Sequence, residues 1–371
     1  MLQQTQFIHK YCKILDHFNS QFPQKKMQQP LFTVIAILFI TISSGKYSQA
    51  IDCKPGRGKK VQHTIIVDQS GKGHFTKIQD AIDSIPINND KWIKVRINPG
   101  TYIEQVTIPE EKPCIFLKGR DRALTTITYN AHMRTDTSAT FTSSPSNVVA
   151  MGITFKNSYN LPYKQNTYSK NISYGIKMPG VGVSPALSAR IYGDKSAFYD
   201  CAFLGVQDTL WDVQGRHHFL NCYIEGAVDF IFGAGQSFYE GCSINVTGDG
   251  VITAQGREFP NDPNGFVLSG CTVSGIEGVR AFLGRAYRPY SRVIFQDSYF
   301  SEVVDPLGWN AWGYVGKEEN FKYAELNCKG PGSKKSKRVP WVITKPSTGH
   351  SEVFSKSSFI DQDGWLAKLP L

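Results

Sequence analysis

The sequence predicts an all-β protein, a solenoid of short parallel strands with one short helix that caps its N-terminal end. Glycine is frequent, with 33 among 371 residues, and only 19% of residues are charged. This composition favours a turn-rich β protein over a helical bundle. A short apolar unit also recurs, and its cysteines Cys201, Cys222 and Cys242 are 21 and 20 residues apart. That period is too short for a helical repeat and suits one coil of a parallel β-solenoid.

Residues 1–50 are predicted to be an N-terminal extension with a signal peptide, ahead of one domain over residues 51–371. An apolar run, Leu31 to Ile42, ends shortly before Ser48-Gln49-Ala50, a small-x-small site suited to signal peptidase. A membrane anchor is the alternative. Crossing about 30 Å of hydrocarbon takes about 20 apolar residues, so export and cleavage are favoured. We therefore expect a secreted, extracellular protein.

Two further features relate to export. The polar stretch ahead of the apolar run is long, which leaves Met1 and Met27 as alternative start codons. Acceptor triplets for N-glycosylation begin at Asn171 and Asn245, and they gain meaning only if the chain is secreted. The sequence therefore predicts a secreted glycoprotein.

A helix and two strands are expected next along the chain. Thr76-Lys77-Ile78-Gln79 has the form of a capping box, whose first and last side chains would satisfy the first backbone N–H groups. Apolar residues then recur at helical spacing: Ile78, Ala81, Ile82 and Ile85. This helix would cover the open end of the solenoid, where strand edges are unpaired. Strands are expected at 92–97 and 101–108, around the turn Asn98-Pro99-Gly100.

The repeat itself consists of two β-prone runs around a polar or glycine corner. Six copies are visible, at residues 148–155, 196–203, 218–224, 237–244, 266–273 and 292–300. Equivalent residues of successive coils would stack about 4.8 Å apart. The cysteines of the repeat should therefore form a ladder.

This ladder leaves two possibilities for the cysteines. Stacked Cα atoms fall within the range of about 4.4 to 6.8 Å that a disulfide requires. Free thiols that fill the narrow interior are the alternative, which is favoured because Cys is small and apolar. Cys53, Cys114 and Cys328 lie outside the repeat, and the sequence pairs none of them. The sequence holds no Cys-x-x-Cys or Cys-x-x-His cluster, so no metal site is predicted.

The charge balance narrows the class of partner. A formal net charge of +10 suits nucleic acid, an acidic polysaccharide or a membrane surface. The most basic run, Lys334-Lys335-Ser336-Lys337-Arg338, has no interleaved aromatic residues and is interpreted as a solvated loop. No nucleic-acid partner is therefore expected, and no stable membrane insertion after signal cleavage.

Asp208 and Asp229 are the strongest candidates for chemistry. They are 21 residues apart, and each follows a cysteine of the repeat by seven residues, which places them at one position on adjacent coils. Two carboxylates that close cannot both ionise easily, so one can act as an acid and the other as a nucleophile. Polar turns are the alternative, which large apolar neighbours disfavour: Leu210, Trp211, Phe230 and Phe232. Asp249 has the same offset from Cys242, but flanking glycines indicate a turn there.

At these residues the chain resembles the pectinesterases, plant pectin methylesterases that fold as a right-handed, single-stranded parallel β-helix. The similarity runs from Thr64 to the C-terminus. Its motifs include Gly71 to Gln79, Gly193 to Tyr199, Gln207-Asp208-Thr209-Leu210, Val228 to Gly233, Leu283-Gly284-Arg285 and Gly308-Trp309-Asn310-Ala311-Trp312. The resemblance implies hydrolysis of pectin methyl esters (methylesterified homogalacturonan) to pectate and methanol in the cell wall, without a cofactor. It also implies a proteinaceous pectinesterase inhibitor as a possible partner.

The resemblance further implies roles for individual residues. Asp229 would attack the ester carbonyl, and Gln207 would donate to the developing oxyanion. Asp208 would protonate departing methanol and then activate water. Arg285 would hold Asp229 ionised and aimed. Substrate contacts are implied for Thr135, Trp211, Tyr287 and Trp309, with ordinary packing as the alternative for the three aromatic residues.

Some features depart from the family pattern. Pro185 stands where a second glutamine is usual, and proline has no side-chain donor. Loss of one oxyanion donor typically costs about 100- to 1,000-fold in turnover, unless Ser184 or Ser188 substitutes. Tyr287 replaces a tryptophan and keeps a ring, and the inhibitor-like pro-domain of many plant members is absent.

Two alternative functions follow from the same fold and groove. A polysaccharide lyase would need a calcium site of several acidic residues, and a polygalacturonase would need Gly-His-Gly and Arg-Ile-Lys motifs; the sequence has none of these. A catalytically impaired relative that only binds pectin is the other alternative, which Pro185 keeps open.

Overall fold

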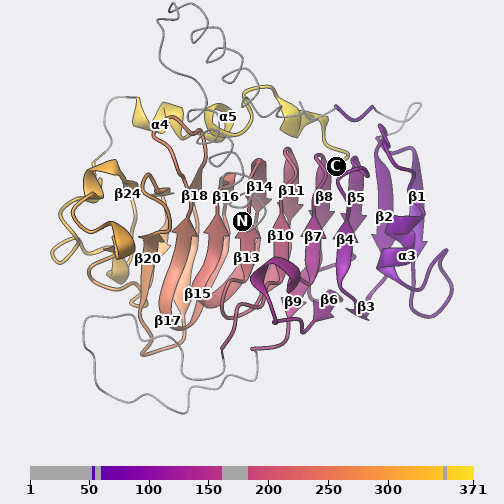
Figure 1. Cartoon of the computed structure of the whole chain (residues 1–371), viewed down its shortest axis with the longest axis horizontal. Helices are drawn as coiled ribbons and strands as arrows, with labels where there is room; N and C mark the ends of the chain where they lie inside the picture. Colours follow the sequence, from indigo (N-terminus) through magenta and orange to yellow (C-terminus); the bar gives the residue numbers. More distant parts are fainter. Residues whose placement is uncertain (1–51, 55–59, 161–182, 346–348) are drawn as a thin grey trace, which may run out of the picture. The chain divides into compact units, whose positions relative to one another are not determined.

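A computed structural model describes residues 52–54, 60–160, 183–345 and 349–371. In these ranges the regular structure is mostly β-strand, and the strands form two sheets (Figure 1). Within each sheet, neighbouring strands pair in parallel. The chain alternates between a ten-stranded and a fourteen-stranded sheet, coil after coil. The predicted all-β parallel β-helix is confirmed. The predicted signal peptide and Asn171 lie outside the described residues.

The ten-stranded sheet takes one strand from each coil, in chain order. Where the later strands pair, the register runs on without a shift, so equivalent side chains form columns across the coils. The strands are β1 (His63–Val67), β2 (Ile93–Ile97), β5 (Ile115–Lys118), β8 (Val148–Met151), β11 (Ser196–Tyr199), β14 (Arg216–Leu220), β16 (Gln236–Glu240), β18 (Gly265–Ser269), β21 (Arg292–Gln296) and β24 (Lys322–Leu326).

The fourteen-stranded sheet forms from two rows of short strands that join at β15 (Tyr223–Gly233). One end of β15 pairs with β12 (Ala202–Leu204) and the other with β13 (Leu210–Asp212). The remaining strands are β3 (Gly100–Ile103), β4 (Val106–Ile108), β6 (Thr125–Tyr129), β7 (Phe141–Ser143), β9 (Thr154–Asn157), β10 (Ala189–Ile191), β17 (Ser243–Gln255), β19 (Thr272–Gly275), β20 (Ala281–Ala286), β22 (Tyr299–Phe300) and β23 (Trp309–Asn310). Asn245, a predicted glycan acceptor, is half-buried within β17.

The cysteine ladder lies next to the corner of each coil. The corner residue has left-handed backbone angles, which Asp, Asn and Gly adopt most readily: φ is 51° at Asp200, 55° at Asn221 and 61° at both Gly241 and Gly270. The next residue is a buried cysteine with a free thiol, namely Cys201, Cys222, Cys242 and Cys271. Their thiols donate to backbone carbonyls of the neighbouring coil or of their own. The prediction of free interior thiols is confirmed.

Cys328 belongs to the same pattern, so the prediction that it lies outside the repeat is wrong. It follows Asn327, whose φ is 53°, at the end of β24. The coil that contains β24 starts after a long insertion, where the short spacing that marks the other copies is lost. The solenoid therefore continues one coil further than the sequence indicates.

The N-terminal helix α3 (Ile78–Asp83) caps the solenoid, but the predicted capping box is wrong. The helix begins one residue later than the box requires, and its N-cap residue, Lys77, makes no side-chain capping bond. The carboxylate of Glu104 instead accepts hydrogen bonds of 3.0 Å from the backbone N–H groups of Ile78 and Gln79. The apolar face packs against β1, β2 and β4 as predicted.

The strand expected at 101–108 is divided into β3 and β4, on either side of Glu104 and Gln105. β3 pairs with β6, whereas β4 pairs with β7 in the other row of the sheet. The chain therefore turns a corner at this point, and the same turn presents Glu104 to α3.

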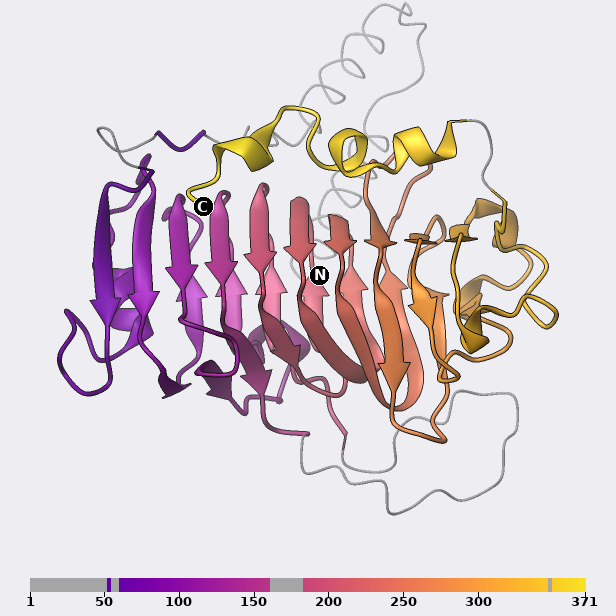
Figure 2. The same ribbon diagram turned by 180° about the vertical axis from the view of Figure 1, so that it is seen from behind.

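The C-terminal segment covers the outer face of the ten-stranded sheet, which the sequence did not predict. α4 (His350–Val353), α5 (Lys356–Phe359) and the 3-10 turn η5 (Trp365–Lys368) run across the ends of successive strands, in yellow in Figure 2. Outward-facing apolar residues of the sheet pack there with Phe354, Phe359, Ile360, Trp365 and Leu369. Further 3-10 turns flank β24, at η3 (Glu318–Asn320) and η4 (Pro331–Ser333). Among the described residues, no helix is long and apolar enough to span a membrane.

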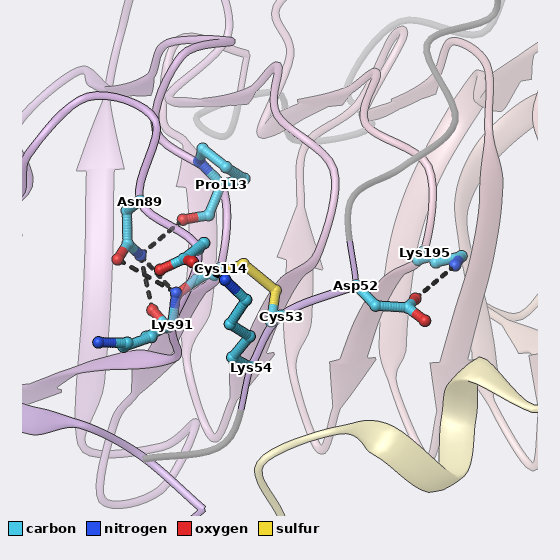
Figure 3. The surroundings of a disulfide bond; sticks show 9 residues. Asp52, Cys53, Lys54, Asn89, Lys91, Pro113, Cys114 and Lys195 are labelled. Carbon is cyan, nitrogen blue, oxygen red and sulfur yellow. Dashed lines mark hydrogen bonds and ion pairs between the residues drawn. A yellow bond between two sulfur atoms is a disulfide. The ribbon is translucent and has the colours of Figure 1, made fainter. Parts of the chain in front are cut away.

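A disulfide between Cys53 and Cys114 anchors the start of the domain (Figure 3). The two Cα atoms are 5.8 Å apart, although the residues are separated by 61 positions in sequence. Beside it, the Asp52 carboxylate forms ion pairs with Lys195 at 2.9 Å and Lys368 at 2.8 Å. The sequence left both cysteines unpaired because neither belongs to the repeat.

Candidate active site

Asp208 and Asp229 occupy one position on successive coils. Gln207 forms a parallel bridge with Val228, and the backbone N–H of Asp208 donates to the Val228 carbonyl at 3.0 Å. The strands on both sides keep the same offset, because β12 and β13 each pair with β15 at a spacing of 21 residues. The register predicted from the cysteine spacing is therefore present.

The backbone at both aspartates is left-handed, with φ of 59° at Asp208 and 49° at Asp229. Such angles are uncommon for residues other than glycine, and they cluster at functional sites. At Asp229 they coincide with a β-bulge: the register between β15 and β17 shifts between Val228 and Ile231. Bulges bend a strand and re-aim a side chain, so the bulge sets the direction of the Asp229 carboxylate.

Arg285 reaches Asp229 from two strands away. It lies on β20 and pairs with Ala254 of β17, which in turn pairs with Phe232 of β15. The small side chain of Ala254 leaves room for the guanidinium to extend over β17, where Nη2 donates to Oδ2 of Asp229. The other carboxylate oxygen, Oδ1, is buried and has no hydrogen-bond partner among the described residues.

The two aspartates have unequal electrostatic surroundings. Burial and the negative charge of Asp229 raise the pKa of Asp208 to about 8, with Arg285 opposing the shift. Burial also raises the pKa of Asp229, but Arg285 opposes this rise through both its charge and a direct hydrogen bond. The pair is thus arranged for one protonated and one ionised carboxyl group near neutral pH.

Gln207 and Pro185 lie on adjacent coils beside the aspartates. Gln207 directly precedes Asp208 and is half-buried, and its carbonyl accepts from the N–H of Ala186, the residue after Pro185. Ser188, one suggested substitute for the missing donor, is fully buried and donates to the Thr209 carbonyl at 2.9 Å. Its hydroxyl is therefore engaged with the backbone, so Ser188 does not replace the missing donor.

Trp211 lies on β13 and Tyr287 directly follows β20, and both side chains are at least partly exposed. Trp211 is half-buried, stacks on Phe232 at 5.3 Å, and has the Arg190 guanidinium 4.6 Å from its ring centre. Tyr287 is 40% exposed and stacks on a further tryptophan, Trp312, at 6.1 Å. These rings can contact a sugar.

Trp309 is buried, so its predicted substrate contact is wrong. The side chain is 1% exposed and packs against Tyr323 at 4.4 Å, while its indole N–H donates to the Glu325 carboxylate at 2.9 Å. Trp309 is part of β23, and its pairing with Gly284 of β20 directs the ring into the core. The alternative, ordinary packing, applies to this residue.

Trp312 is the site residue that sequence reasoning missed. It begins the 3-10 turn η2 (Trp312–Tyr314), is 46% exposed, and its ring centre lies 3.9 Å from the guanidinium carbon of Arg285. The Trp312 ring therefore covers one side of the Arg285 guanidinium and limits the access of water to it. Trp312 stands in the same short motif as Trp309, which could have drawn attention to it. The three-residue spacing between the two tryptophans does not show which ring faces outward.

Thr135 begins the 3-10 turn η1 (Thr135–Thr137) and is half-buried. Arg190, which stacks on Trp211, donates to the Asp136 carbonyl and so joins this turn to Trp211. In the part of the chain that the structure describes, no group of three or more His, Cys, Asp or Glu side chains is suited to hold a metal ion.

Comparisons with known proteins agree in their result. The family model described as Pectinesterase matches residues 64–363. The chain is 47% identical to "Probable pectinesterase 55" of Arabidopsis thaliana over 86% of its length and 94% of the relative. "Probable pectinesterase 29" of the same plant is 46% identical, over 84% of the chain and 90% of the relative.

Similar solved structures are also pectin methylesterases. The carrot pectin methylesterase is 28% identical and superposes with a TM-score of 0.73, over 82% of this chain and 95% of that chain. The Aspergillus niger pectin methylesterase is 26% identical with a TM-score of 0.67, over 86% of this chain and 99% of that chain. On the strength of the family match and of these relatives, the chain belongs to the pectinesterase family.

Proposed function

We propose that this protein hydrolyses the methyl esters of pectin, with Asp229 as nucleophile and Asp208 as general acid and base. One observation carries the proposal: equivalent aspartates of adjacent coils lie beside a guanidinium that bonds only to Asp229. Family membership supports a carboxylic ester hydrolase. A relative that only binds pectin is not favoured, because the similar proteins are pectinesterases over nearly their full length.

The reaction follows from the two protonation states. The Asp229 carboxylate attacks the ester carbonyl carbon, while the Gln207 amide donates to the oxyanion that develops. Asp208 gives its proton to the departing methoxide, which leaves as methanol. The ionised Asp208 then takes a proton from water, and the resulting hydroxide attacks the acyl–enzyme. Asp229 leaves as a carboxylate, Asp208 is protonated again, and the carboxylic acid formed on the sugar loses its proton to solvent.

Arg285 acts through Asp229. Its charge and hydrogen bond favour the ionised form of the nucleophile, and the Trp312 ring holds the guanidinium in place. Trp211, Tyr287 and Thr135 are proposed to contact the pectin chain on both sides of the ester. A proteinaceous pectinesterase inhibitor stays an expectation from the family resemblance.

The test is methanol release from highly methylated pectin. Asp229→Asn should abolish release, because an amide oxygen is a far weaker nucleophile than a carboxylate. Asp80→Asn is the matched control, since Asp80 is exposed on α3 and far from both aspartates in the sequence and the fold. Release that survives Asp229→Asn in a folded protein would contradict the assigned nucleophile.

Secretion and cleavage after Ala50 are proposed on the residues before Ile51. Asp52 and Cys53 are fixed by ion pairs and a disulfide immediately after that point, and a disulfide suits an oxidising compartment. N-terminal sequencing of protein collected from the medium of plant cells should read Ile51 first. A mature chain that keeps residues 31–42 would overturn this proposal.

A further inference from the structure

A hollow of about 370 Å³ lies between the ten-stranded sheet and the C-terminal segment. Its lining includes Gln236 of β16, Arg292 of β21 and Lys322 of β24, together with Phe354 between α4 and α5 and Phe359 at the end of α5. Figure 1 shows α4 and α5 next to the ends of β16 and β18. The candidate active site belongs to the other sheet, so this hollow is a separate feature.

A glycine provides the room in this part of the sheet. Gln236 pairs with Gly265 in the column, and Arg292 pairs with Lys322. A Cβ atom on Gly265 would lie 2.6 Å from Cδ of Arg292, so the arginine side chain lies across the glycine. Any larger residue at Gly265 would displace Arg292.

The hollow gathers positive charge. Arg292 and Lys322 are neighbours on adjacent parallel strands, about 4.8 Å apart at the backbone, and like charges so placed repel each other. Burial and the charge of Arg257 lower the pKa of Arg292 to about 10, with the negative charge of Asp262 opposing the shift. Burial and the charges of Arg292 and Arg257 also lower the pKa of Lys322. None of the described residues that line the hollow is acidic.

The positive charge of Arg292 is not balanced by an ion pair among the described residues. Arg292 is 9% exposed, and its guanidinium donates to two backbone carbonyls, of Pro263 and Asn264, at 3.0 and 3.1 Å. Its buried Nε has no hydrogen-bond partner among the described residues. Buried charges are normally paired, so the Arg292 guanidinium is suited to bind an anion.

Arg216, at the other end of the same column, shows the usual solution. It pairs with Gln236 in the register, and it forms ion pairs with Asp194 at 2.7 Å and Asp363 at 2.8 Å. The column is therefore neutralised by the protein at Arg216 and left positive at Arg292 and Lys322.

We propose that this hollow is a second, non-catalytic site that binds the carboxylate of an acidic sugar. Arg292 and Lys322 would pair with the carboxylate, and the edges of Phe354 and Phe359 would contact the apolar face of the ring. That the hollow binds an anion is inferred from its lining residues alone. The choice of a uronic acid rests on the proposed function, because hydrolysis releases galacturonate carboxylates. Demethylated pectin would then be held at the ten-stranded sheet, while methyl-esterified pectin enters the active site on the other sheet.

The experiment measures the labelling rate of individual lysines by acetic anhydride, with peptide mass spectrometry, in the presence of digalacturonate. Pairing with a carboxylate raises the pKa of an amine by about one unit or more, which lowers its reactive free-amine fraction about tenfold. We expect Lys322 to be labelled about tenfold more slowly at saturating digalacturonate. Lys317, an exposed lysine in the preceding loop, is the matched control and should not change.

Two further arms identify the ligand chemistry. The dimethyl ester of digalacturonate, tested on the Asp229→Asn protein so that it stays intact, should not protect Lys322. Inorganic phosphate should protect it less than digalacturonate does. Equal protection by phosphate, or unchanged labelling with digalacturonate, would overturn the proposal. Arg292→Gln, if folded by circular dichroism, should lose protection. Methanol release is measured on the same samples, so failure of the second site is distinguishable from failure of the proposed function.

Discussion

Asp208 is the residue whose protonation state matters most to the reaction. As general acid it must carry a proton when methanol leaves, and its pKa of about 8 keeps that proton in place at neutral pH. The same shift has a consequence for stability. Between its ordinary pKa of 3.8 and about 8 the folded state binds this proton and the unfolded chain does not. Stability therefore falls as pH rises through this window.

The first prediction concerns the pH dependence of catalysis and folding. Methanol release should fall on the alkaline side with an apparent pKa near 8, because Asp208 loses its proton. In Asp208→Asn the cost of the buried charge is gone, so the free energy of unfolding should fall less between pH 4 and 8 than in the unsubstituted protein. Urea unfolding at several pH values measures this, with Asp80→Asn as control. Parallel curves of unfolding free energy against pH for Asp208→Asn and the unsubstituted protein would contradict the raised pKa of Asp208.

A second prediction concerns the oxyanion donors. Pro185→Gln restores a side-chain amide at the position where the family usually has one, and a single oxyanion donor is worth about 100-fold or more in turnover. We expect kcat to rise by about tenfold to 100-fold, with KM little changed. Pro185→Ala, which removes the ring without adding a donor, should show no such gain. Equal gains in both variants would assign the effect to the backbone.

At the scale of elements, the cap of α3 shows how a short helix is held. Six residues form too few internal hydrogen bonds to be stable alone. Glu104 satisfies two of the free N–H groups at its start, and the negative charge is favourable at a helix N-terminus. The helix that closes the solenoid is thus stabilised by a residue from the corner between β3 and β4.

This arrangement gives a third prediction. Glu104→Ala should lower the free energy of unfolding by about 1 to 2 kcal/mol, the usual range for loss of a helix cap. Thr76→Ala tests the capping box that the sequence suggested and should have little effect, because the helix starts after Lys77. Denaturant unfolding measures both. A larger loss in Thr76→Ala than in Glu104→Ala would restore the capping box.

For the whole molecule, the two terminal segments of the domain are fastened to the coils. The disulfide joins Cys53 to Cys114, Asp52 contacts both Lys195 and Lys368, and Trp365 is buried on the ten-stranded sheet. A solenoid has mostly local contacts between neighbouring coils. Links between positions far apart in sequence therefore contribute cooperativity that stacking alone does not provide.

The fourth prediction follows from the length of the loop that the disulfide closes. The 61-residue separation corresponds to about 4 kcal/mol in the chain-entropy estimate. The double variant Cys53→Ser and Cys114→Ser should lose about 2 to 4 kcal/mol in urea unfolding. Dithiothreitol should reduce the stability of the unsubstituted protein by a similar amount and leave the double variant unchanged. A comparable effect of dithiothreitol on the double variant would assign the loss to other cysteines.

The repeat spacing and the composition predicted the β-solenoid, and the spacing predicted the common position of Asp208 and Asp229; the free interior thiols were favoured because Cys is small and apolar. This was possible because a coil with a parallel register converts a fixed offset in sequence into adjacency in space. The family motifs pointed to Gln207 and Arg285, whose offsets from Asp229 differ and follow no period.

The tertiary structure decided what the period does not encode. It showed that Glu104 rather than Thr76 caps α3, that Cys53 pairs with Cys114, and that Trp312 rather than Trp309 is exposed beside Arg285. Each of these depends on where an irregular segment, such as a corner, a loop or a terminal segment, is placed on the coils. The chain length of such a segment does not fix its path, whereas inside the repeat the hydrogen-bonded register fixes the position of each residue.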